Sequence, residues 1–283
     1  MFDTLAITWD VDPVMFTIFG RGVRYYGLSW ALAIGLGAWL FTQFCRREGL
    51  SEKIADSAFW YVSLGTIIGS RLGHCLFYDF AATMANPLKI LYIHEGGMAS
   101  HGAAIGMLVG LWLFARKNKM PYVWGLDRIV IAASIGGSFV RFGNLMNSEI
   151  YGTPTDLPWG FIFVRTGETV PMHPTQIYEA LCYILTFVVL AVMYYKFDQG
   201  RRHPGMLFGV GLIGIFLSRF IIEYIKQVQE SWEEGMVLLM GQWLSIPFIL
   251  LGAACIALSY TERFKKYVPV PTEKPKVSNA KKR

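Results

Sequence analysis

Residues 204–225 read PGMLFGVGLIGIFLSRFIIEYI. About 20 consecutive, mainly apolar residues suffice for one helical crossing of a bilayer, so this stretch predicts a membrane-spanning helix. It also contains Arg219 and Glu223. A charged side chain at the centre of a span costs about 2.5–3.5 kcal/mol on insertion scales, so these two residues need a structural or functional reason.

The rest of the chain repeats this apolar pattern. Of its 283 residues, 54% are hydrophobic and 16% are charged, against about 25% charged in soluble domains. Seven segments have roughly the length of a span: 26–44, 57–77, 98–115, 129–146, 176–195, 204–225 and 236–260. We therefore predict an all-α polytopic membrane protein with about seven transmembrane helices, formed by a single membrane-embedded domain at residues 1–260.

Lysine and arginine are distributed unevenly among the connections. Most of those outside the spans lie after the first, third and fifth segments and in the C-terminal tail. Because cytoplasmic loops carry such an excess, the N-terminus is expected outside and the C-terminus inside. This asymmetry also explains the net charge of +6 without a nucleic-acid partner. Residues 261–283 are expected to form a basic, disordered cytoplasmic tail.

The outside connections at 78–100 and 147–175 are long enough to form small extracytoplasmic caps. Residues 158–171 resemble a hairpin, with WGFIFV before the turn RTGE, and the alternation in residues 7–20 predicts further extended structure. The cysteines lie scattered in apolar segments without metal-ligand spacing, and we interpret them as small buried hydrophobic residues. They are Cys45, Cys75, Cys182 and Cys255.

Ionisable side chains within the predicted spans gather toward the outer ends of those spans. They are Arg71, His74, His101, Arg141, Glu179, Arg219 and Glu223. An arginine fork binds phosphate bidentately, and a low local dielectric strengthens such a pair. The natural anion at that depth is a phospholipid headgroup, so the sequence predicts a headgroup site in the outer half of the bilayer.

Other interpretations of these residues remain open. Arg219 and Glu223 have the i, i+4 spacing of a helix ion pair, and Glu179 or Glu149 could neutralise Arg141, so the charges could simply stabilise the bundle. A transporter or flippase of an anionic lipid would also use membrane arginines. Its site would lie near the midplane, often between repeats, and the sequence shows neither a repeat nor a polar route inward. A scaffold without a ligand would not justify several buried arginines.

Residues 141–152, RFGNLMNSEIYG, resemble the signature R-x-G-N-F-x-N-x-E-x-x-G of the bacterial prolipoprotein diacylglyceryl transferases. Six further motifs follow the family's order, and the resemblance covers residues 13 to 260. They are YYG at 25–27, GSRLG at 69–73, EGGMASHG at 95–102, HPTQIYE at 173–179, RFIIE at 219–223 and MGQWLSIP at 240–247.

Three positions depart from the family pattern. Val140 precedes the signature arginine, where the family usually has glycine. Lys226 stands where many members have a second arginine after the sixth-span motif, and Ile215 replaces a tyrosine found in some members. A role for that tyrosine therefore does not transfer to this chain.

The resemblance implies a transferase of the cytoplasmic membrane whose site faces the extracytoplasmic side. Such an enzyme moves the diacylglyceryl group of phosphatidylglycerol to the thiol of a lipobox cysteine in an exported preprolipoprotein and releases glycerol phosphate. The expected partners are phosphatidylglycerol, the lipobox segment and the lipid bilayer. No cofactor and no metal is expected, because the sequence shows no P-loop and no carboxylate pair typical of magnesium sites. The substrate supplies the nucleophile, so none of the four cysteines need take part.

The resemblance also suggests residue roles. Arg141 and Arg219 match the family's key arginines, and we expect them to bind the phosphate as its negative charge grows. His101 is the hypothesised base for a thiol whose unperturbed pKa is near 8.5. The remaining substrate-binding predictions are Tyr26, Arg71, Asn144, Glu149, Gly152 and Glu223, with Gly152 expected in a tight turn.

Overall fold

The structure is a computed structural model that describes residues 6–92, 97, 99–228, 233 and 235–265. It is predominantly helical, with four short strands in the described part of the chain. The chain divides into two compact units, each described below by itself. Unit 1 comprises Met1–Gly37 and Asp127–Lys266, and unit 2 comprises Ala38–Leu126 and Tyr267–Arg283.

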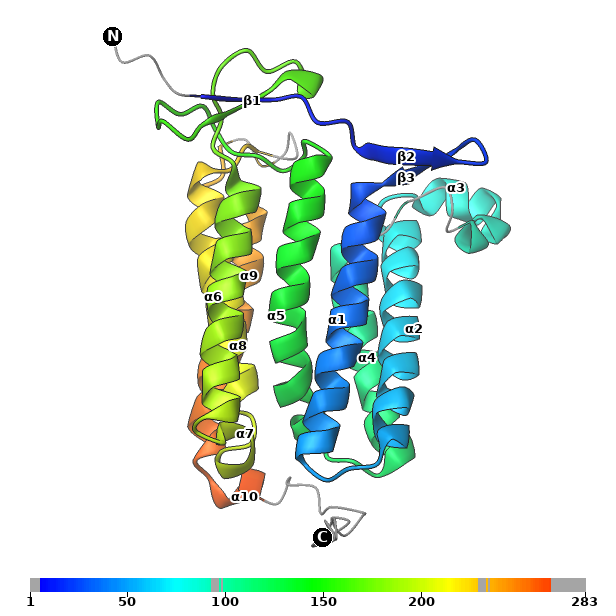
Figure 1. Cartoon of the computed structure of the whole chain (residues 1–283), viewed down its shortest axis with the longest axis vertical. Helices are drawn as coiled ribbons and strands as arrows, with labels where there is room; N and C mark the ends of the chain where they lie inside the picture. Colours follow the sequence, from blue (N-terminus) through cyan, green and yellow to red (C-terminus); the bar gives the residue numbers. More distant parts are fainter. Residues whose placement is uncertain (1–5, 93–96, 98, 229–232, 234, 266–283) are drawn as a thin grey trace, which may run out of the picture. The chain divides into compact units, whose positions relative to one another are not determined.

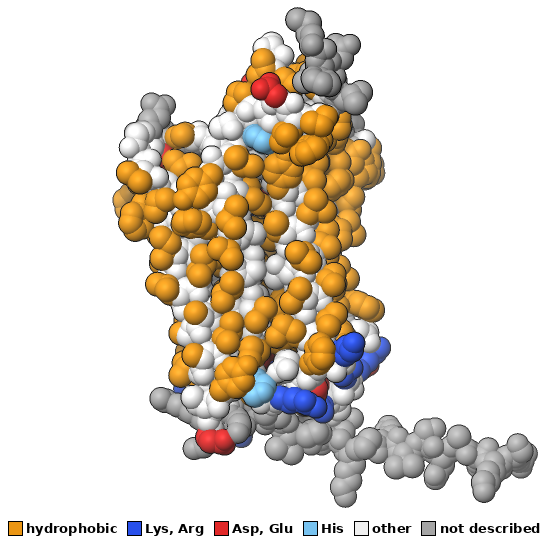
Figure 2. Space-filling view, turned by 90° about the vertical axis from the view of Figure 1, so that its left-hand side faces the viewer, with side chains coloured by type: hydrophobic (Ala, Val, Ile, Leu, Met, Phe, Trp, Pro, Cys, Tyr) orange, Lys and Arg blue, Asp and Glu red, His pale blue; other side chains and the backbone are white. Residues whose placement is uncertain are grey.

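Each of the seven predicted segments contains a long helix. They are α1 (Tyr25–Arg47), α2 (Glu52–Phe77), α4 (Ser100–Asn118), α5 (Tyr122–Met146), α6 (Thr175–Tyr195), α8 (Met206–Ile222, continued by the 3-10 turn η4, Glu223–Ile225) and α9 (Met240–Ser259). Within the described residues, α1, α5, α6, α8 with η4, and α9 are long and apolar enough to cross a membrane. Hydrophobic side chains cover much of the face in Figure 2, with lysine and arginine toward one end. These features fit a multi-pass membrane protein.

In unit 2, α2 and α4 pack along two rows of glycines. Gly65, Gly69 and Gly73 share one face of α2 because four-residue spacing returns to the same side of a helix. A Cβ added at Gly69 would lie 2.7 Å from the Cα of Gly106, and one at Gly73 would lie 2.8 Å from the Cα of Gly102. The two backbones therefore approach more closely than any larger side chain permits, as small-residue interfaces do between membrane helices.

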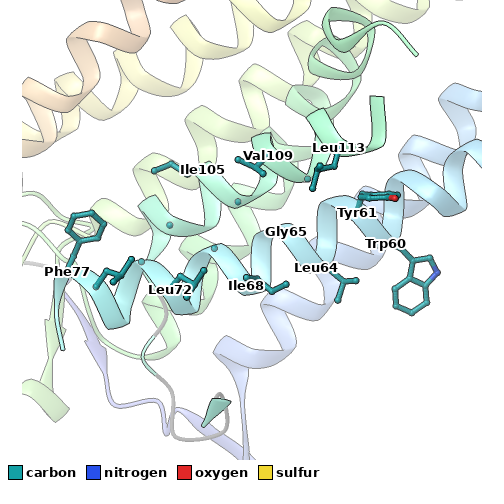
Figure 3. Close-up of a pocket in the computed structure, with 16 residues that line it drawn as sticks. Trp60, Tyr61, Leu64, Gly65, Ile68, Leu72, Phe77, Ile105, Val109 and Leu113 are labelled. Carbon is teal, nitrogen blue, oxygen red and sulfur yellow. The ribbon is translucent and has the colours of Figure 1, made fainter. Parts of the chain in front are cut away.

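An apolar groove of about 510 Å³ runs beside this glycine contact (Figure 3). Side chains of α2, such as Leu64 and Ile68, line it together with Ile105 and Val109 of α4. None of the described residues that line it is charged. The groove therefore suits hydrocarbon and offers nothing to an anionic headgroup.

In unit 1, α5, α6, α8 and α9 run alongside one another (Figure 1). Helices α8 and α9 approach at Gly209, where an added Cβ would lie 2.6 Å from the carbonyl oxygen of Gly252, and Phe216 stacks on Phe248 with ring centroids 4.2 Å apart. This close packing holds the α8 backbone in a fixed place beside its neighbours, so the side chains at the end of α8 are also fixed in position.

A second contact within unit 1 joins α5 to the start of α8. The Asp127 carboxylate accepts hydrogen bonds from the backbone N–H groups of Gly205 (2.7 Å) and Phe208 (2.8 Å), which are free at the beginning of a helix. Arg128 donates to the carbonyl oxygen of Gly200 at 3.3 Å and lies over the Tyr194 ring. We call these two residues, both fully buried, the Asp127–Arg128 pair.

The hairpin predicted at 158–171 forms only in part, because Phe161 and Met172 exchange two backbone hydrogen bonds but form no ladder. Strand β4 (Phe161–Phe163) pairs in parallel with β1 (Ile7–Trp9), and the 3-10 turn η3 (Val164–Thr166) follows it. An isolated antiparallel bridge joins Phe161 to Met172. Phe161 and Phe163 are buried with Leu145 and Met172 against Trp9, whose indole N–H donates to the Leu145 carbonyl oxygen. A distant strand therefore supplies the partner, because it brings the tryptophan that covers this cluster.

The remaining elements are short. Strands β2 (Val14–Ile18) and β3 (Arg21–Arg24) form an antiparallel hairpin, which confirms the extended structure expected near the start of the chain. The cap at 78–100 contains α3 (Phe80–Ala85) and the 3-10 turn η1 (Pro87–Leu91). Helices α7 (Gln199–Arg202) and α10 (Glu262–Lys265) complete the described elements, and residues 266–283 of the predicted tail lie outside the described part. All four cysteines are free, and two of them, Cys45 and Cys75, are buried.

Candidate functional site

Four charged side chains from α5, α6 and the end of α8 meet in unit 1. They are Arg141, Glu179, Glu223 and Lys226, which we call the charge cluster. The Glu179 carboxylate pairs with the Arg141 Nε through Oε2 and with the Lys226 Nζ, 2.8 Å away, through Oε1. Lys226 also donates to Glu223 Oε2 at 3.2 Å. Glu179 is fully buried and the Lys226 residue is 4% exposed, so these charges depend on one another for compensation.

The surrounding backbone leaves space for this cluster. A Cβ added at Gly241, in the first turn of α9, would lie 2.6 Å from Glu223 Oε2, so any larger residue there would displace that carboxylate. On α5, a Cβ added at Gly137 would lie 3.0 Å from the ring of Tyr183, which is one turn of α6 beyond Glu179. Glycine at these two positions lets the carboxylates of α6 and η4 approach the cations.

Arg141 has a second set of partners among the signature residues. Its Nη1 donates to Asn144 Oδ1 at 3.1 Å, and Asn144 Nδ2 donates to Glu149 Oε1 at 2.7 Å. Asn147 Nδ2 donates to the same carboxylate oxygen at 3.3 Å. The signature residues therefore form a hydrogen-bonded chain that begins at the Arg141 guanidinium and ends on Glu149.

The loop after α5 is held against α6. Ser148 and Ile150 both have positive φ, at 53° and 61°, and they make the turn. Gln176 Nε2 donates to the Glu149 carbonyl oxygen at 2.7 Å, and Thr175 Oγ1 donates to that of Ile150 at 2.8 Å. The start of α6 thus fixes the loop that carries Glu149.

Gly152 does not have the role expected for it in a tight turn. Its φ is not positive. A Cβ added there would lie 2.8 Å from both the His173 Cβ and the Thr175 Cγ2, and Gly152 bridges Lys226 in an antiparallel backbone contact. Glycine is needed at this position for the close approach of two chain segments.

Tyr26 lies against the signature segment as well. A Cβ added at Gly143 would lie 2.8 Å from Tyr26 Cδ2 and 3.2 Å from its Cα. The signature glycine therefore brings the start of α1 against α5 within one turn of Arg141. Tyr26, Asn144, Glu149, Gly152 and Glu223 all belong to unit 1, as do both candidate arginines.

Arg219 differs from Arg141 in its partners. Within the described residues its half-buried guanidinium makes no hydrogen bond or ion pair, although its charge is close enough to interact with Glu179. The i, i+4 pair expected with Glu223 does not form among these residues, because Glu223 binds Lys226 instead. The donors of Arg219 are therefore open to a ligand beside a cluster of paired charges.

The remaining two predicted residues, Arg71 and His101, lie in unit 2. Arg71 donates to the carbonyl oxygens of Ile90 and Gly97, both at 3.1 Å, and to that of Lys89. These bonds favour the structural interpretation of Arg71, as the residue that holds the segment before α4. His101 is the second residue of α4 and its side chain lies outside the described part, so its role as a base stays a prediction.

Two members of the charge cluster were absent from the predicted site. Glu179 belongs to the ionisable residues of the predicted spans and to the HPTQIYE motif, but the sequence suggests no role for it beyond neutralising Arg141. Lys226 stands out in the sequence only as a departure from the family pattern. The spacing of three residues between Glu223 and Lys226 could have placed them on one face. Their joint pairing with Glu179 could not be read from the sequence, because Lys226 is 47 residues further along the chain than Glu179.

Comparisons with known proteins identify the family of this chain. The family described as prolipoprotein diacylglyceryl transferase matches residues 13–258. A relative from Porphyromonas gingivalis is 51% identical over 260 residues, which cover 87% of this chain and 92% of the relative. Relatives from Bacteroides fragilis and Tolumonas auensis are both 41% identical, over 88% and 90% of this chain and 93% and 98% of their own lengths. All three are named phosphatidylglycerol–prolipoprotein diacylglyceryl transferase. The chain therefore belongs to the prolipoprotein diacylglyceryl transferase family and is a transferase.

Proposed function

We propose that this protein transfers the diacylglyceryl group of phosphatidylglycerol to the thiol of a lipobox cysteine in an exported preprolipoprotein. The thiol sulfur forms a thioether bond to a glycerol carbon, and the bond from that carbon to the phosphate oxygen breaks. The electron pair leaves on glycerol phosphate, and the thiol proton passes to a base. The observation that carries the proposal is the Arg219 guanidinium, which has no hydrogen bond or ion pair among the described residues and lies near the Glu179 carboxylate that pairs with Arg141.

The two arginines suit different parts of this reaction. Phosphatidylglycerol carries one phosphodiester charge, and negative charge grows on the phosphate as it leaves. Groups that bind the leaving phosphate more tightly than the diester lower the barrier. We assign direct binding of the phosphate to Arg219, whose donors have no acceptor among the described residues. Arg141, fixed by Glu179 and Asn144, supplies further donors at a preset position.

The other predicted residues support these two. Asn144 and Glu149 hold the Arg141 guanidinium through their hydrogen-bonded chain. Tyr26 orients the headgroup from the start of α1. His101 is the proposed acceptor of the thiol proton, since a neutral imidazole is the side chain best suited to that task near neutral pH.

The proposal includes a membrane arrangement. Helices α2 and α4 join the five strongly apolar helices as the sixth and seventh spans, supported by their glycine contact and by the groove that suits hydrocarbon. The excess of basic residues in alternate connections supports an outside N-terminus and a cytoplasmic C-terminus. The charge cluster then lies in the outer part of the cytoplasmic membrane, where an exported substrate presents its cysteine.

A transfer assay tests the proposed reaction. Purified full-length protein in detergent is mixed with phosphatidylglycerol and a lipobox peptide, and both glycerol phosphate release and the peptide mass are measured. We expect a diacylglyceryl adduct with the cysteine peptide and none with a matched peptide in which serine replaces cysteine. Phosphatidylethanolamine in place of phosphatidylglycerol tests the choice of lipid. If a relative forms the adduct under the same conditions and this protein does not, the proposed function is wrong.

The assignment of the base has its own test. His101→Gln retains a polar side chain but cannot accept the thiol proton, so the rate should fall by about 10²-fold or more. Full turnover in this variant would exclude His101 as the base while leaving the transfer reaction intact.

A further inference from the structure

We propose that Glu179 and Lys226 are positioning residues that fix the Arg141 guanidinium for the phosphate. The inference deepens the proposed function and depends on it for the identity of the anion. It assigns a role to Lys226, which departs from the arginine found in many family members, and to Glu179, which neither the signature nor the predicted site includes.

The Glu179 carboxylate divides its two oxygens between two cations. Oε2 pairs with Arg141 and Oε1 accepts from Lys226 at 2.8 Å. A carboxylate held from both sides has a fixed position. The Arg141 guanidinium is held at two points, by its ion pair with that carboxylate and by its hydrogen bond to Asn144 Oδ1. The direction in which the remaining Arg141 donors point therefore depends on Glu179 as well as on Asn144.

Lys226 is itself fixed by three contacts. Its Nζ donates to Glu223 at 3.2 Å, its backbone N–H donates to the Glu223 carbonyl oxygen at 3.2 Å, and its backbone bridges Gly152. These contacts join the end of α8 to the loop after α5, which carries the last residues of the signature. Lys226 thus connects Arg141, through Glu179, to the same loop that Asn144 and Glu149 reach from the other side.

The effect of Glu179→Gln on anion binding distinguishes a positioning role of Glu179 from a contribution of its charge alone. Replacement of Glu179 by glutamine removes a negative charge beside Arg141 and Arg219, so charge alone predicts tighter binding of an anion. Positioning predicts the opposite result, because Arg141 loses one of the partners that hold its guanidinium. A misplacement of about 1 Å in a catalytic geometry can cost about 10²-fold in rate.

A merely structural ion pair would give a third result. Removal of one member of a buried pair leaves an uncompensated charge and lowers stability. If stability were the whole contribution, a variant assayed well below its unfolding temperature would keep its turnover. The Asp127–Arg128 pair provides the control, because Asp127→Asn removes a buried charge from the same unit at a position that contacts the start of α8.

The experiment measures kcat, KM for phosphatidylglycerol, thermal unfolding and the affinity for glycerol phosphate by calorimetry, on the full-length protein in detergent. We expect Glu179→Gln to lower kcat by about 10²-fold. It should also bind glycerol phosphate more weakly, although the loss of a carboxylate makes the site more positive. Glu179→Asp, one methylene shorter, should lie between this variant and the wild type. Asp127→Asn should unfold at a lower temperature with unchanged kcat and unchanged affinity.

Lysine variants test the connection through Glu179. Lys226→Arg keeps the charge and should retain activity within about threefold, whereas Lys226→Met should lose about tenfold. The double variant Glu179→Gln/Lys226→Met should lose no more activity than Glu179→Gln alone, because Lys226 acts through Glu179. It should also be more stable than Lys226→Met, since no carboxylate at residue 179 is left without its lysine.

Several results would overturn the inference. Tighter binding of glycerol phosphate by Glu179→Gln would show a contribution of charge only, and unchanged kcat with lowered stability would show a structural pair. If the activity losses of the two single variants multiply in the double variant, Lys226 does not act through Glu179. The calorimetric comparison requires no turnover, so it stands even if wild-type protein fails to transfer lipid, a result that would overturn the proposed function instead.

Discussion

Unit 1 contains two buried ionic groups that are satisfied in different ways. In the Asp127–Arg128 pair, the Asp127 carboxylate accepts two backbone N–H groups and Arg128 donates to a backbone carbonyl oxygen, with both side chains 0% exposed. In the charge cluster, the charged side chains bind one another, and the Arg141 side chain is 12% exposed. Arg219 beside them has no hydrogen bond or ion pair within the described residues.

If the proposed function is right, this difference separates a structural role from a binding role. Burial of a charge is costly unless it is paired and hydrogen-bonded, and the Asp127–Arg128 pair meets that cost with backbone groups of the protein itself. A guanidinium that has no hydrogen-bond acceptor within the protein needs one from a ligand or from water to be equally well satisfied. The position of a charged residue in a span is therefore less informative than the number of its donors that the protein leaves open.

Removal of the open arginine should have the largest effect on activity. We expect Arg219→Ala to lower kcat by about 10³-fold, comparable to the loss of a principal donor to a developing negative charge. Its unfolding temperature should stay close to that of the wild type, because no described partner is left unpaired. Transfer assays and thermal unfolding in detergent measure the two quantities.

Arg219→Lys keeps the charge but not the bidentate fork, and it should recover part of the lost rate. If Arg219→Ala were strongly destabilised yet active, Arg219 would have a structural role, like that expected of the Asp127–Arg128 pair.

The opposite outcome is expected at the Asp127–Arg128 pair. Asp127→Asn should destabilise the protein by about 3 kcal/mol, because Arg128 loses its buried countercharge and the start of α8 loses a charged acceptor. The kcat at 25 °C should remain within about twofold of the wild type. Thermal unfolding and a transfer assay on the same preparation compare the two effects. A loss of activity without a loss of stability would place this pair in the functional machinery.

A smaller effect is expected within the signature. Asn144→Ala removes the hydrogen bonds from Arg141 (3.1 Å) and to Glu149 (2.7 Å), and the rate should fall by about 10- to 30-fold, the equivalent of about 1.4–2 kcal/mol. Asn147→Ala removes a longer bond of 3.3 Å to the same carboxylate and should cost less. Equal losses in the two variants would mean that the bond between Arg141 and Asn144 does not matter.

Much of this arrangement follows from the sequence. Apolar segments predict the seven long helices of the described residues, five of which are apolar enough to cross a membrane. Arg141, Asn144 and Glu149, all in the signature, form one chain of hydrogen bonds. The division between Arg141 and Arg219 does not follow, because it depends on which carboxylate reaches which cation. The spacing of Arg219 and Glu223 predicts an ion pair, but Lys226 binds Glu223 and leaves the arginine open.

Two further features of the fold could not be predicted from neighbouring residues in the sequence. The partner of β4 is β1, more than 150 residues earlier, because Trp9 covers the buried phenylalanines. The glycines of α2 and α4 recur at four-residue spacing, a pattern typical of close contacts between membrane helices. The spacing does not identify the partner helix, which the structure supplies.

The smallest expected effect concerns pH and the cap that adjoins the charge cluster. Burial lowers the pKa of His173, which precedes α6 and lies with Nδ1 3.4 Å from the Tyr178 hydroxyl. The folded protein therefore binds a proton at this residue less readily than the unfolded chain. Stability from His173 is present above its ordinary pKa of about 6.5 and is lost as pH falls below that value.

Thermal unfolding at pH 7.5 and pH 5 should show this contribution as a difference between wild type and His173→Gln. The wild type should lose at most about 2 °C more than the variant on acidification, because the side chain is only partly buried. Other groups titrate in both proteins and cancel in the comparison. An equal loss in both would mean that His173 takes up its proton in the folded protein without cost. Its surroundings would then tolerate an unpaired positive charge, whereas the buried Arg128 has the Asp127 carboxylate beside it.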